Sequence, residues 1–203
     1  MSSTRQRWLK AVADQTGASP EDVEVLEFGA KLLVNCVMDI TVIFTIAFFL
    51  GTLPSVAVGY FVVAVLKYFA GGAHAHTMLN CLIIGVVVYT SMGLLAHTLA
   101  TWSPITPPIT FAGVSALSVG AFTKFAPATP PQKPVRSARH YQHLKKGALL
   151  TLSAVLILGA FYLIRPFAPQ ELFWAGCLAL VWQSFILFPG SRRLFENIER
   201  YLF

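Results

Sequence analysis

The stretch Lys67-Tyr-Phe-Ala-Gly-Gly-Ala-His-Ala-His-Thr-Met-Leu-Asn-Cys81 separates two long apolar runs and determines where the chain turns. Its paired glycines, Gly71 and Gly72, can adopt backbone conformations that other residues avoid. It also carries two histidines and a cysteine, which are unusual between segments that are otherwise almost entirely apolar. We therefore expect two helices that meet at this stretch, and we expect chemistry where they meet.

The composition of the whole chain is that of an integral membrane protein. Of its 203 residues, 56% are hydrophobic and only 12% are charged, and the mean hydropathy is +0.66. A soluble domain carries about a quarter charged residues. We predict an all-α, polytopic membrane protein with a single membrane-embedded domain over residues 1–203, of which 1–30 form a cytoplasmic or interfacial region. The net charge of +6 flanks apolar segments and is not interleaved with aromatic residues, so we expect no nucleic-acid partner.

Six apolar segments are candidates for membrane spans. A span needs roughly 20 apolar residues to cross the hydrocarbon core of a bilayer. The segments cover about residues 32–50, 53–66, 81–100, 108–123, 147–164 and 172–188. The second segment is short, and it spans only if the Lys67 side chain snorkels to the interface or if the helix starts near Gly51. The alternative is that it and the third segment form a re-entrant pair that dips into the membrane.

The distribution of lysine and arginine predicts the orientation. Basic residues gather in the N-terminal region, in the loops after the second and fourth segments, and at the C-terminus, whereas the opposite loops hold only Arg165. Short cytoplasmic loops carry an excess of lysine and arginine. Both termini and the stretch 67–81 should therefore face the cytoplasm.

Two features near the N-terminus predict helices outside the apolar segments. Ser19 and Pro20 form a helix start, with Ser19 as the cap and Pro20 in the first helical position. A short amphipathic helix on the cytoplasmic membrane surface is predicted from the spacing of Arg5, Trp8, Leu9 and Val12.

His74 and Cys81 supply the two groups of a cysteine protease. The imidazole takes the thiol proton and later protonates the leaving amine. On one continuous helix, seven residues would place them about 10.5 Å apart along the axis, which is too far for a hydrogen bond. The helix must therefore break before or between these two residues, and Gly71 and Gly72 give the backbone the freedom to fold His74 back toward Cys81. A cysteine near a helix N-terminus and beside a cation such as Lys67 is activated as a thiolate, and Thr77 or His76 would cap that helix.

Other readings of this stretch remain open. His76 competes with His74 as the base. The two histidines could bind a metal with Cys81 as a third ligand, although the spacing is not a familiar zinc pattern. Both could also simply lie at the level of the lipid headgroups. We expect no metal and no cofactor.

The first apolar segment holds two polar residues that are candidates for a third catalytic member, Asp39 and Asn35. Asp39 is the only acidic residue within a predicted span, and acidic groups inside membranes are costly and usually functional. Asp39 would orient His74 or bind Lys67. Asn35, one turn shallower, would orient the imidazole as an amide. The alternative is that Asp39 is a protonated hydrogen-bond partner between helices.

The stretch 67–81 resembles the signature of the accessory gene regulator B (AgrB) family, which are quorum-sensing membrane endopeptidases of bacteria. Members carry a basic residue, then Phe-Ala-Gly-Gly-x-His-Ala-x-Thr, and then a cysteine seven residues past the histidine. The chain length, the six apolar segments and a basic loop with Lys133-Pro134 are also similar to the family.

The resemblance implies a reaction and its participants. His74 and Cys81 would be the catalytic pair of an enzyme that cuts the C-terminal tail from a short amphipathic propeptide (AgrD-like). Cys81 would form a thioester, which a thiol or hydroxyl of the substrate then attacks to close a thiolactone or lactone. The resemblance also implies the bacterial cell membrane as location, a homodimer, and no cofactor. Where the family usually has arginine, this chain has Lys67, which lacks the bidentate fork.

The loop after the fourth segment is proline-rich and basic. Its charges would lie against an anionic membrane surface or bind an acidic peptide, and the alternative is that they act only as a topology signal. The candidates for substrate binding are Lys133, Arg136 and Arg139.

Two other functional classes are compatible with these residues. A small membrane transporter or exporter would use Asp39 with His74 or His76 as a proton or ion relay. A sensor without enzymatic activity would not need the Cys81 thiol.

Overall fold

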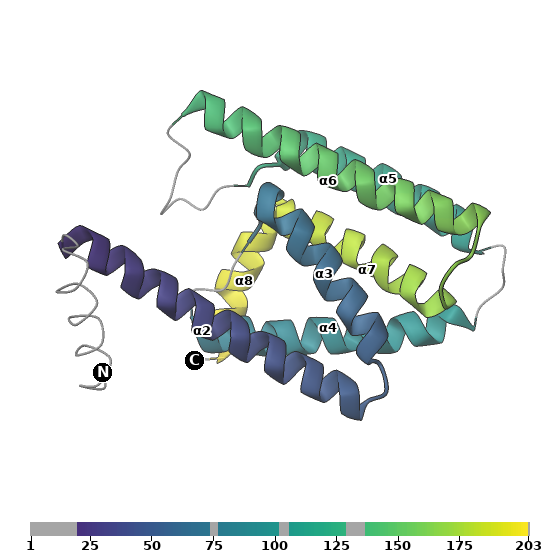
Figure 1. The fold of residues 1–203 in the computed structure, drawn as a ribbon, viewed down its shortest axis with the longest axis horizontal. Coiled ribbons are helices and arrows are strands. Elements are labelled where there is room, and N and C mark those ends of the chain that lie inside the picture. Colours follow the sequence, from purple (N-terminus) through teal and green to yellow (C-terminus); the bar gives the residue numbers. More distant parts are fainter. Residues whose placement is uncertain (1–19, 74–76, 102–105, 129–136, 203) are drawn as a thin grey trace. The chain divides into compact units, whose positions relative to one another are not determined.

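The computed structural model describes residues 20–73, 77–101, 106–128 and 137–202 (Figure 1). Within these ranges the chain is helical, and the prediction of an all-α fold is confirmed for them. The first helix begins at Pro20, as predicted; Ser19 and the expected amphipathic helix near Trp8 lie outside the described residues. The helices are α2 (Pro20–Phe49), α3 (Leu53–Ala70), α4 (Met78–Ala100), α5 (Thr106–Phe125), α6 (Ala138–Ile164), α7 (Gln170–Leu187) and α8 (Pro189–Leu202).

The chain forms two compact units, Met1–Val42 and Ile43–Phe203. The described part of the first unit is the N-terminal portion of α2. The second unit holds the last turns of α2 and the helices from α3 to α8.

Four of the described helices are long and apolar enough to cross a membrane, namely α3, α4, α6 and α7. The apolar part of α2, Leu33–Phe49, is shorter than this. Helix α5 has 20 residues, with prolines at its second and third positions, and is not among these four. The first and fourth predicted segments are thus helical, whereas the total of six spans stays a prediction.

The second predicted segment is longer than its apolar run suggested. It forms one continuous helix from Leu53 to Ala70, with Lys67 in its last turn. The four methylene groups of a lysine can lie along apolar neighbours while the ammonium reaches a polar region. This lets α3 continue past Leu66, as expected if Lys67 extends the second segment.

Helix α7 is the centre of the second unit. It packs against α3, α4 and α5, and α6 packs against α3 and α5 (Figure 1). Ser184 of α7 donates a buried hydrogen bond to Ser118 Oγ of α5, at 3.1 Å. Small residues and polar pairs of this kind hold helices together in a bilayer, where lipid tails are as apolar as leucine and burial alone gives little driving force.

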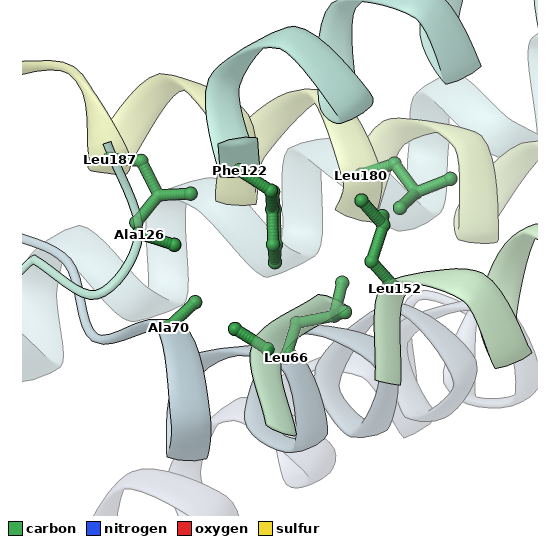
Figure 2. Packing of buried hydrophobic residues seen from close by; sticks show 8 residues of the cluster. Leu66, Ala70, Phe122, Ala126, Leu152, Leu180 and Leu187 are labelled. Carbon is green, nitrogen blue, oxygen red and sulfur yellow. The ribbon is translucent and has the colours of Figure 1, made fainter. Parts of the chain in front are cut away.

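A cluster of buried side chains lies beside the end of α3. Figure 2 shows Phe122 of α5, Leu152 of α6 and Leu180 of α7 gathered in one cluster with Leu66 and Ala70 of α3. The cluster fixes the last turn of α3, and therefore the point at which the Gly71–Gly72 turn leaves the packed helices. Its members are Leu66, Ala70, Phe122, Ala126, Ala148, Leu152, Leu180 and Leu187.

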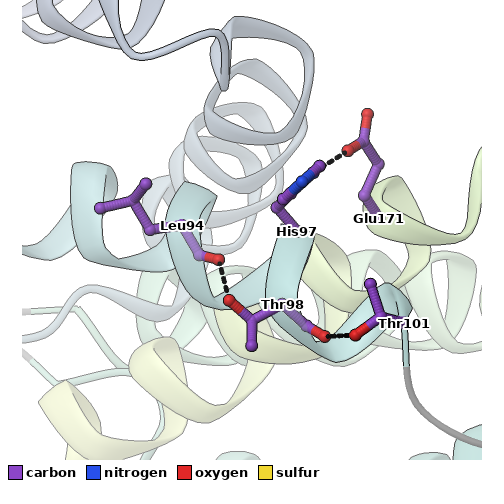
Figure 3. Close-up of polar contacts among 5 residues, drawn as sticks. All are labelled: Leu94, His97, Thr98, Thr101 and Glu171. Carbon is purple, nitrogen blue, oxygen red and sulfur yellow. Dashed lines mark hydrogen bonds and ion pairs between the residues drawn. The ribbon is translucent and has the colours of Figure 1, made fainter.

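The other ends of α4 and α7 are joined by a side-chain hydrogen bond between His97 and Glu171. Nδ1 of His97, in the last turn of α4, lies 3.2 Å from a carboxylate oxygen of Glu171, in the first turn of α7 (Figure 3). The His97 side chain is 72% exposed. Exposed pairs contribute about 0–1 kcal/mol to stability. This contact therefore adds little to the stability of the fold.

Candidate active site

Helix α3 ends at Ala70, directly before the paired glycines, as these residues predicted, and the chain turns at Gly71–Ala73. Helix α4 begins at Met78, so the chain from Lys67 to Cys81 is not one continuous helix. Gly71 has φ of +68° and Gly72 has φ of +141°, conformations that L side chains rarely adopt. A Cβ atom at Gly71 would also collide with the carbonyl oxygen of Ala128. Glycine is required at Gly71 on both counts.

The segment that follows α5 holds one side of this turn. The backbone N–H of Ala128 donates to the carbonyl of Ala70 at 2.8 Å, and Gly71 forms a parallel bridge with Ala128. The last carbonyls of a helix have no partner within the helix. Ala128 satisfies one of them here, and the basic proline-rich loop continues directly from Ala128.

The C-terminal end of α7 holds the other side. The Gln183 Nε2 group donates to the carbonyl of Gly71 at 3.0 Å, and the N–H of Ala73 donates to the carbonyl of Ile186 at 2.9 Å. Ser191 Oγ, at the start of α8, donates to the same Ile186 carbonyl at 3.2 Å. The backbone of Gly71 and Ala73 is thus tied to one end of α7.

Cys81 lies in the first turn of α4 and is partly buried. Thr77 is the N-cap: its side-chain oxygen accepts from the N–H of Asn80 at 3.2 Å, and its carbonyl accepts from the N–H of Cys81 at 3.1 Å. The two predicted caps are thereby resolved in favour of Thr77. The partial positive charge at a helix N-terminus favours an anion there, which includes a thiolate.

A Lys67 ammonium and a Cys81 thiolate would attract each other across the turn. Lys67 is half-buried in the last turn of α3, and Cys81 is in the first turn of α4. Two sources of positive potential, the lysine and the helix N-terminus, therefore act on the same thiol.

The predicted base, His74, and its competitor His76 lie outside the described residues, between Ala73 and Thr77. The assignment of His74, and the metal alternative that needs both histidines, stay predictions.

Asn35 and Asp39 lie one turn apart on α2. Asn35 Nδ2 donates to an Asp39 carboxylate oxygen at 3.3 Å. The second carboxylate oxygen is buried and has no hydrogen-bond partner among the described residues. Both belong to the first unit and Cys81 belongs to the second. A role for either beside the imidazole stays a prediction.

Of the three residues predicted to bind the substrate, the structure describes Arg139. It is exposed in the first turns of α6 and lines a cavity of about 540 Å³ together with Lys146. Lys133 and Arg136 lie outside the described residues. The Lys145 ammonium donates to the carbonyl of Thr123 at 2.8 Å, which joins α6 to the end of α5. The cavity is lined by Ser137, Arg139, His140, Gln142, His143 and Lys146.

Sequence reasoning missed Gln183, Ile186 and Ala128. Ile186 and Ala128 act through their backbones, which no sequence pattern marks. Gln183 acts through its side chain, and an amide within a predicted span is rare and usually faces other helices. Its position inside the segment 172–188 could therefore have marked it as a contact between helices.

Comparison with known proteins agrees with the signature at residues 67–81. The family model described as accessory gene regulator B matches residues 6–187. A "Putative AgrB-like protein" of Clostridium perfringens (strain SM101 / Type A) is 23% identical over 197 residues, covering 94% of this chain and 92% of that protein. A "Putative AgrB-like protein 2" of Clostridium perfringens (strain 13 / Type A) is 21% identical over 155 residues, covering 75% and 72%. No solved structure matches. Since the family model covers most of the chain, this protein belongs to the accessory gene regulator B family.

Proposed function

We propose that this protein is a membrane cysteine endopeptidase that removes the C-terminal tail of a short propeptide and promotes closure of a thiolactone or lactone ring. Membership of its family links the chain to the accessory gene regulator system of quorum sensing. The proposal assigns Cys81 as nucleophile and His74 as general base and acid.

The observation that carries the proposal is the position of Cys81. The thiol lies in the first turn of a helix capped by Thr77, and as a thiolate it would attract the Lys67 ammonium. A thiolate is the reactive form of cysteine, and a helix N-terminus and a neighbouring cation both stabilise it. The turn at Gly71 and Gly72 releases residue 74 from the helical spacing that would keep it away from Cys81.

The reaction has two acyl transfers. The Cys81 thiolate attacks the scissile carbonyl, the C–N bond breaks, and the leaving amine of the tail takes its proton from the His74 imidazolium. A thiol or hydroxyl of the same substrate then attacks the thioester carbonyl and gives its proton to His74, and Cys81 leaves as thiolate. No water is consumed, and the energy of the thioester is retained in the ring, so the site must exclude water after acylation.

The acidic tail of the propeptide is proposed to bind at the basic start of α6. Arg139 and Lys146 line the cavity there, and Lys133 and Arg136 precede it in the chain. The family signature has Arg where this chain has Lys67, so Lys67 acts here as a point charge and not as a bidentate carboxylate ligand.

The test uses the purified protein in proteoliposomes with a synthetic peptide that has an amphipathic N-terminal helix, a central cysteine and an acidic C-terminal tail. Mass spectrometry follows the released tail and the substrate-linked thioester on the fragment that contains Cys81. Wild type should form both, and hydroxylamine should release the adduct.

Three variants make the test specific. Cys81→Ser should neither release the tail nor form the thioester. Cys36→Ser and Cys177→Ser should do both, because those thiols lie elsewhere, on α2 and α7. Tail release that persists in Cys81→Ser at the wild-type rate would overturn the proposal. A proton or ion flux that is lost on Asp39→Asn, without peptide cleavage by wild type, would favour the transporter instead.

A further inference from the structure

Gln183 is an amide side chain in the most enclosed part of the protein. It lies on α7, is 0% exposed, and comes from a span whose neighbouring residues are mostly apolar. A polar group buried among apolar side chains costs free energy unless it is hydrogen-bonded. Such a residue in a membrane helix usually has a specific partner, and here the partner is the turn at Gly71.

The orientation of the Gln183 amide follows from the chemistry of its partner. The carbonyl of Gly71 can only accept a hydrogen bond, so the NH₂ group of Gln183 must face it. This leaves Oε1 as the group that is not bonded to Gly71. None of the described residues donates a hydrogen bond to this buried oxygen. Because half of the amide is unsatisfied, packing alone would favour an apolar side chain here.

The second contact comes from the same face of α7. Gln183 and Ile186 are three residues apart, a spacing that places them as neighbours on one helix face. The Ile186 carbonyl is one of the last in α7 and has no partner within the helix, and it accepts from Ala73 at 2.9 Å. The space for this approach exists because Gly72 has no side chain: a Cβ there would lie 3.0 Å from the Ile186 side chain.

These contacts fix the chain at the residue directly before the proposed base. Gly71 is held through its carbonyl and Ala73 through its N–H, both by α7. On the other side of the turn, Cys81 is fixed by the cap of α4. Since α7 packs against both α3 and α4, the two halves of the turn share α7 as a common support.

We propose that Gln183 is a positioning residue of the peptidase reaction: its side-chain amide holds the Gly71 carbonyl and thereby sets the backbone that carries the general base relative to Cys81. This inference rests on the proposed function. The hydrogen bond of Gln183 goes to the backbone of the turn, so we assign it an indirect role through that backbone. Removing its donor should therefore lower kcat and leave KM nearly unchanged.

Two substitutions separate the hydrogen bond from the shape of the side chain. Gln183→Met has nearly the same length but no donor, so we expect kcat to fall about tenfold to a hundredfold at every pH, as for a misplaced catalytic group. Gln183→Glu can donate to Gly71 only when it is protonated. Its kcat relative to wild type at the same pH should therefore rise as the pH is lowered and fall as the carboxylate forms. Gln170→Glu, at the other end of α7, is the matched control and should follow wild type throughout.

Hydrogen–deuterium exchange provides a readout that does not depend on activity. The backbone N–H of Ala73 donates to the Ile186 carbonyl, so it should be protected in wild type. In Gln183→Met it should exchange faster, while the amides of mid-α7 keep their protection. If exchange at residues 71–73 and kcat both stay at wild-type values in Gln183→Met, the positioning role is overturned. A lower thermal midpoint with an unchanged kcat of the folded protein would also overturn it, because that is the signature of a structural role only.

The same experiments distinguish this inference from the proposed function. If wild type forms no thioester but Gln183→Met still loses protection at Ala73, the peptidase assignment fails and the hydrogen-bonded turn stands. If wild type forms the thioester and Gln183→Glu shows the same pH profile as Gln170→Glu, the peptidase assignment stands and the role of Gln183 fails.

Discussion

The N–H of Ala73 donates to the carbonyl of Ile186 at 2.9 Å, which joins the turn before the proposed catalytic histidine to the end of a helix more than a hundred residues later in the chain. The contact satisfies a helix-end carbonyl that has no partner within α7 and that also accepts from Ser191 Oγ at 3.2 Å. The turn is therefore held in place by hydrogen bonds to α7. Changes in its backbone should alter activity strongly.

Gly71→Ala tests the backbone of the turn. Alanine at φ of +68° is strained, and its Cβ would collide with the Ala128 carbonyl. We expect activity to fall by about tenfold or more, since a left-handed conformation alone costs about 1–2 kcal/mol for a residue with a side chain. Tail release in proteoliposomes, with thermal unfolding in parallel, measures the effect.

Gly113→Ala is the control for that change. Gly113 lies within α5, and a Cβ atom there would meet nothing within 4 Å. Alanine favours a helix over glycine by up to about 1 kcal/mol, so this variant should be as active as wild type and equally or more stable. Equal loss of activity in both variants would contradict the specific role of Gly71.

Lys67→Met tests the cation beside the thiol. Methionine keeps an unbranched apolar chain but removes the charge that would attract a Cys81 thiolate. We expect the rate of Cys81 alkylation by iodoacetamide at neutral pH to fall roughly threefold to tenfold, since one nearby charge is worth on the order of 1 kcal/mol. Lys67→Arg keeps the charge and should retain most of the rate.

Lys124→Met is the matched control for the charge effect. Lys124 is an exposed lysine in the last turn of α5 that lies over the Phe125 ring at 5.4 Å from its centroid. Its removal changes the net charge of the protein by the same amount. The alkylation rate should stay at the wild-type value, and a fall equal to that of Lys67→Met would assign the effect to the overall charge.

Thr77→Ala tests the cap of α4. The Thr77 side chain accepts from the N–H of Asn80, and loss of such a cap costs about 1 kcal/mol. The thermal midpoint should fall by roughly 2–4 °C, and Cys81 should be alkylated more slowly because the first turn of α4 is less ordered. Thr77→Ser keeps the hydroxyl and should restore both quantities.

Thr98→Ala gives the comparison on the same helix. Thr98 is exposed and donates its hydroxyl to the Leu94 carbonyl within α4, so it caps nothing (Figure 3). Alanine is a better helix former than threonine. The variant should therefore be as stable as wild type or slightly more so, with unchanged alkylation of Cys81.

Local features of the turn could be predicted from the sequence. The pair Gly71 and Gly72 indicated a helix break, and Thr77 was one of two predicted caps. Both depend on the conformational preferences of single residues and their immediate neighbours. Helix α3 continues past Leu66, the end of the predicted apolar segment, and includes Lys67 in its last turn, in agreement with the expectation that the stem of Lys67 lies along the helix.

The supports of the turn could not be predicted in this way. Gln183 is 112 residues from Gly71 in sequence, and the contact forms only when α7 packs against α3. A single sequence does not show which spans are neighbours, nor which face of a span is turned toward a loop. The position of His74 relative to Cys81 stays a prediction for the same reason, together with the roles of Asp39 and Asn35.

Arg139→Gln tests the proposed binding of the acidic tail at the start of α6. Arg139 is exposed and lines the basic cavity, so its charge acts on the substrate through solvent. KM for the acidic-tailed peptide should rise several-fold at low salt with kcat nearly unchanged, and the difference should shrink at high salt as charges are screened. A peptide with an amidated, neutral tail should show no difference between Arg139→Gln and wild type. Arg165→Gln, in an exposed loop after α6, is the control, and an equal rise of KM in that variant would show that Arg139 acts only through the net charge.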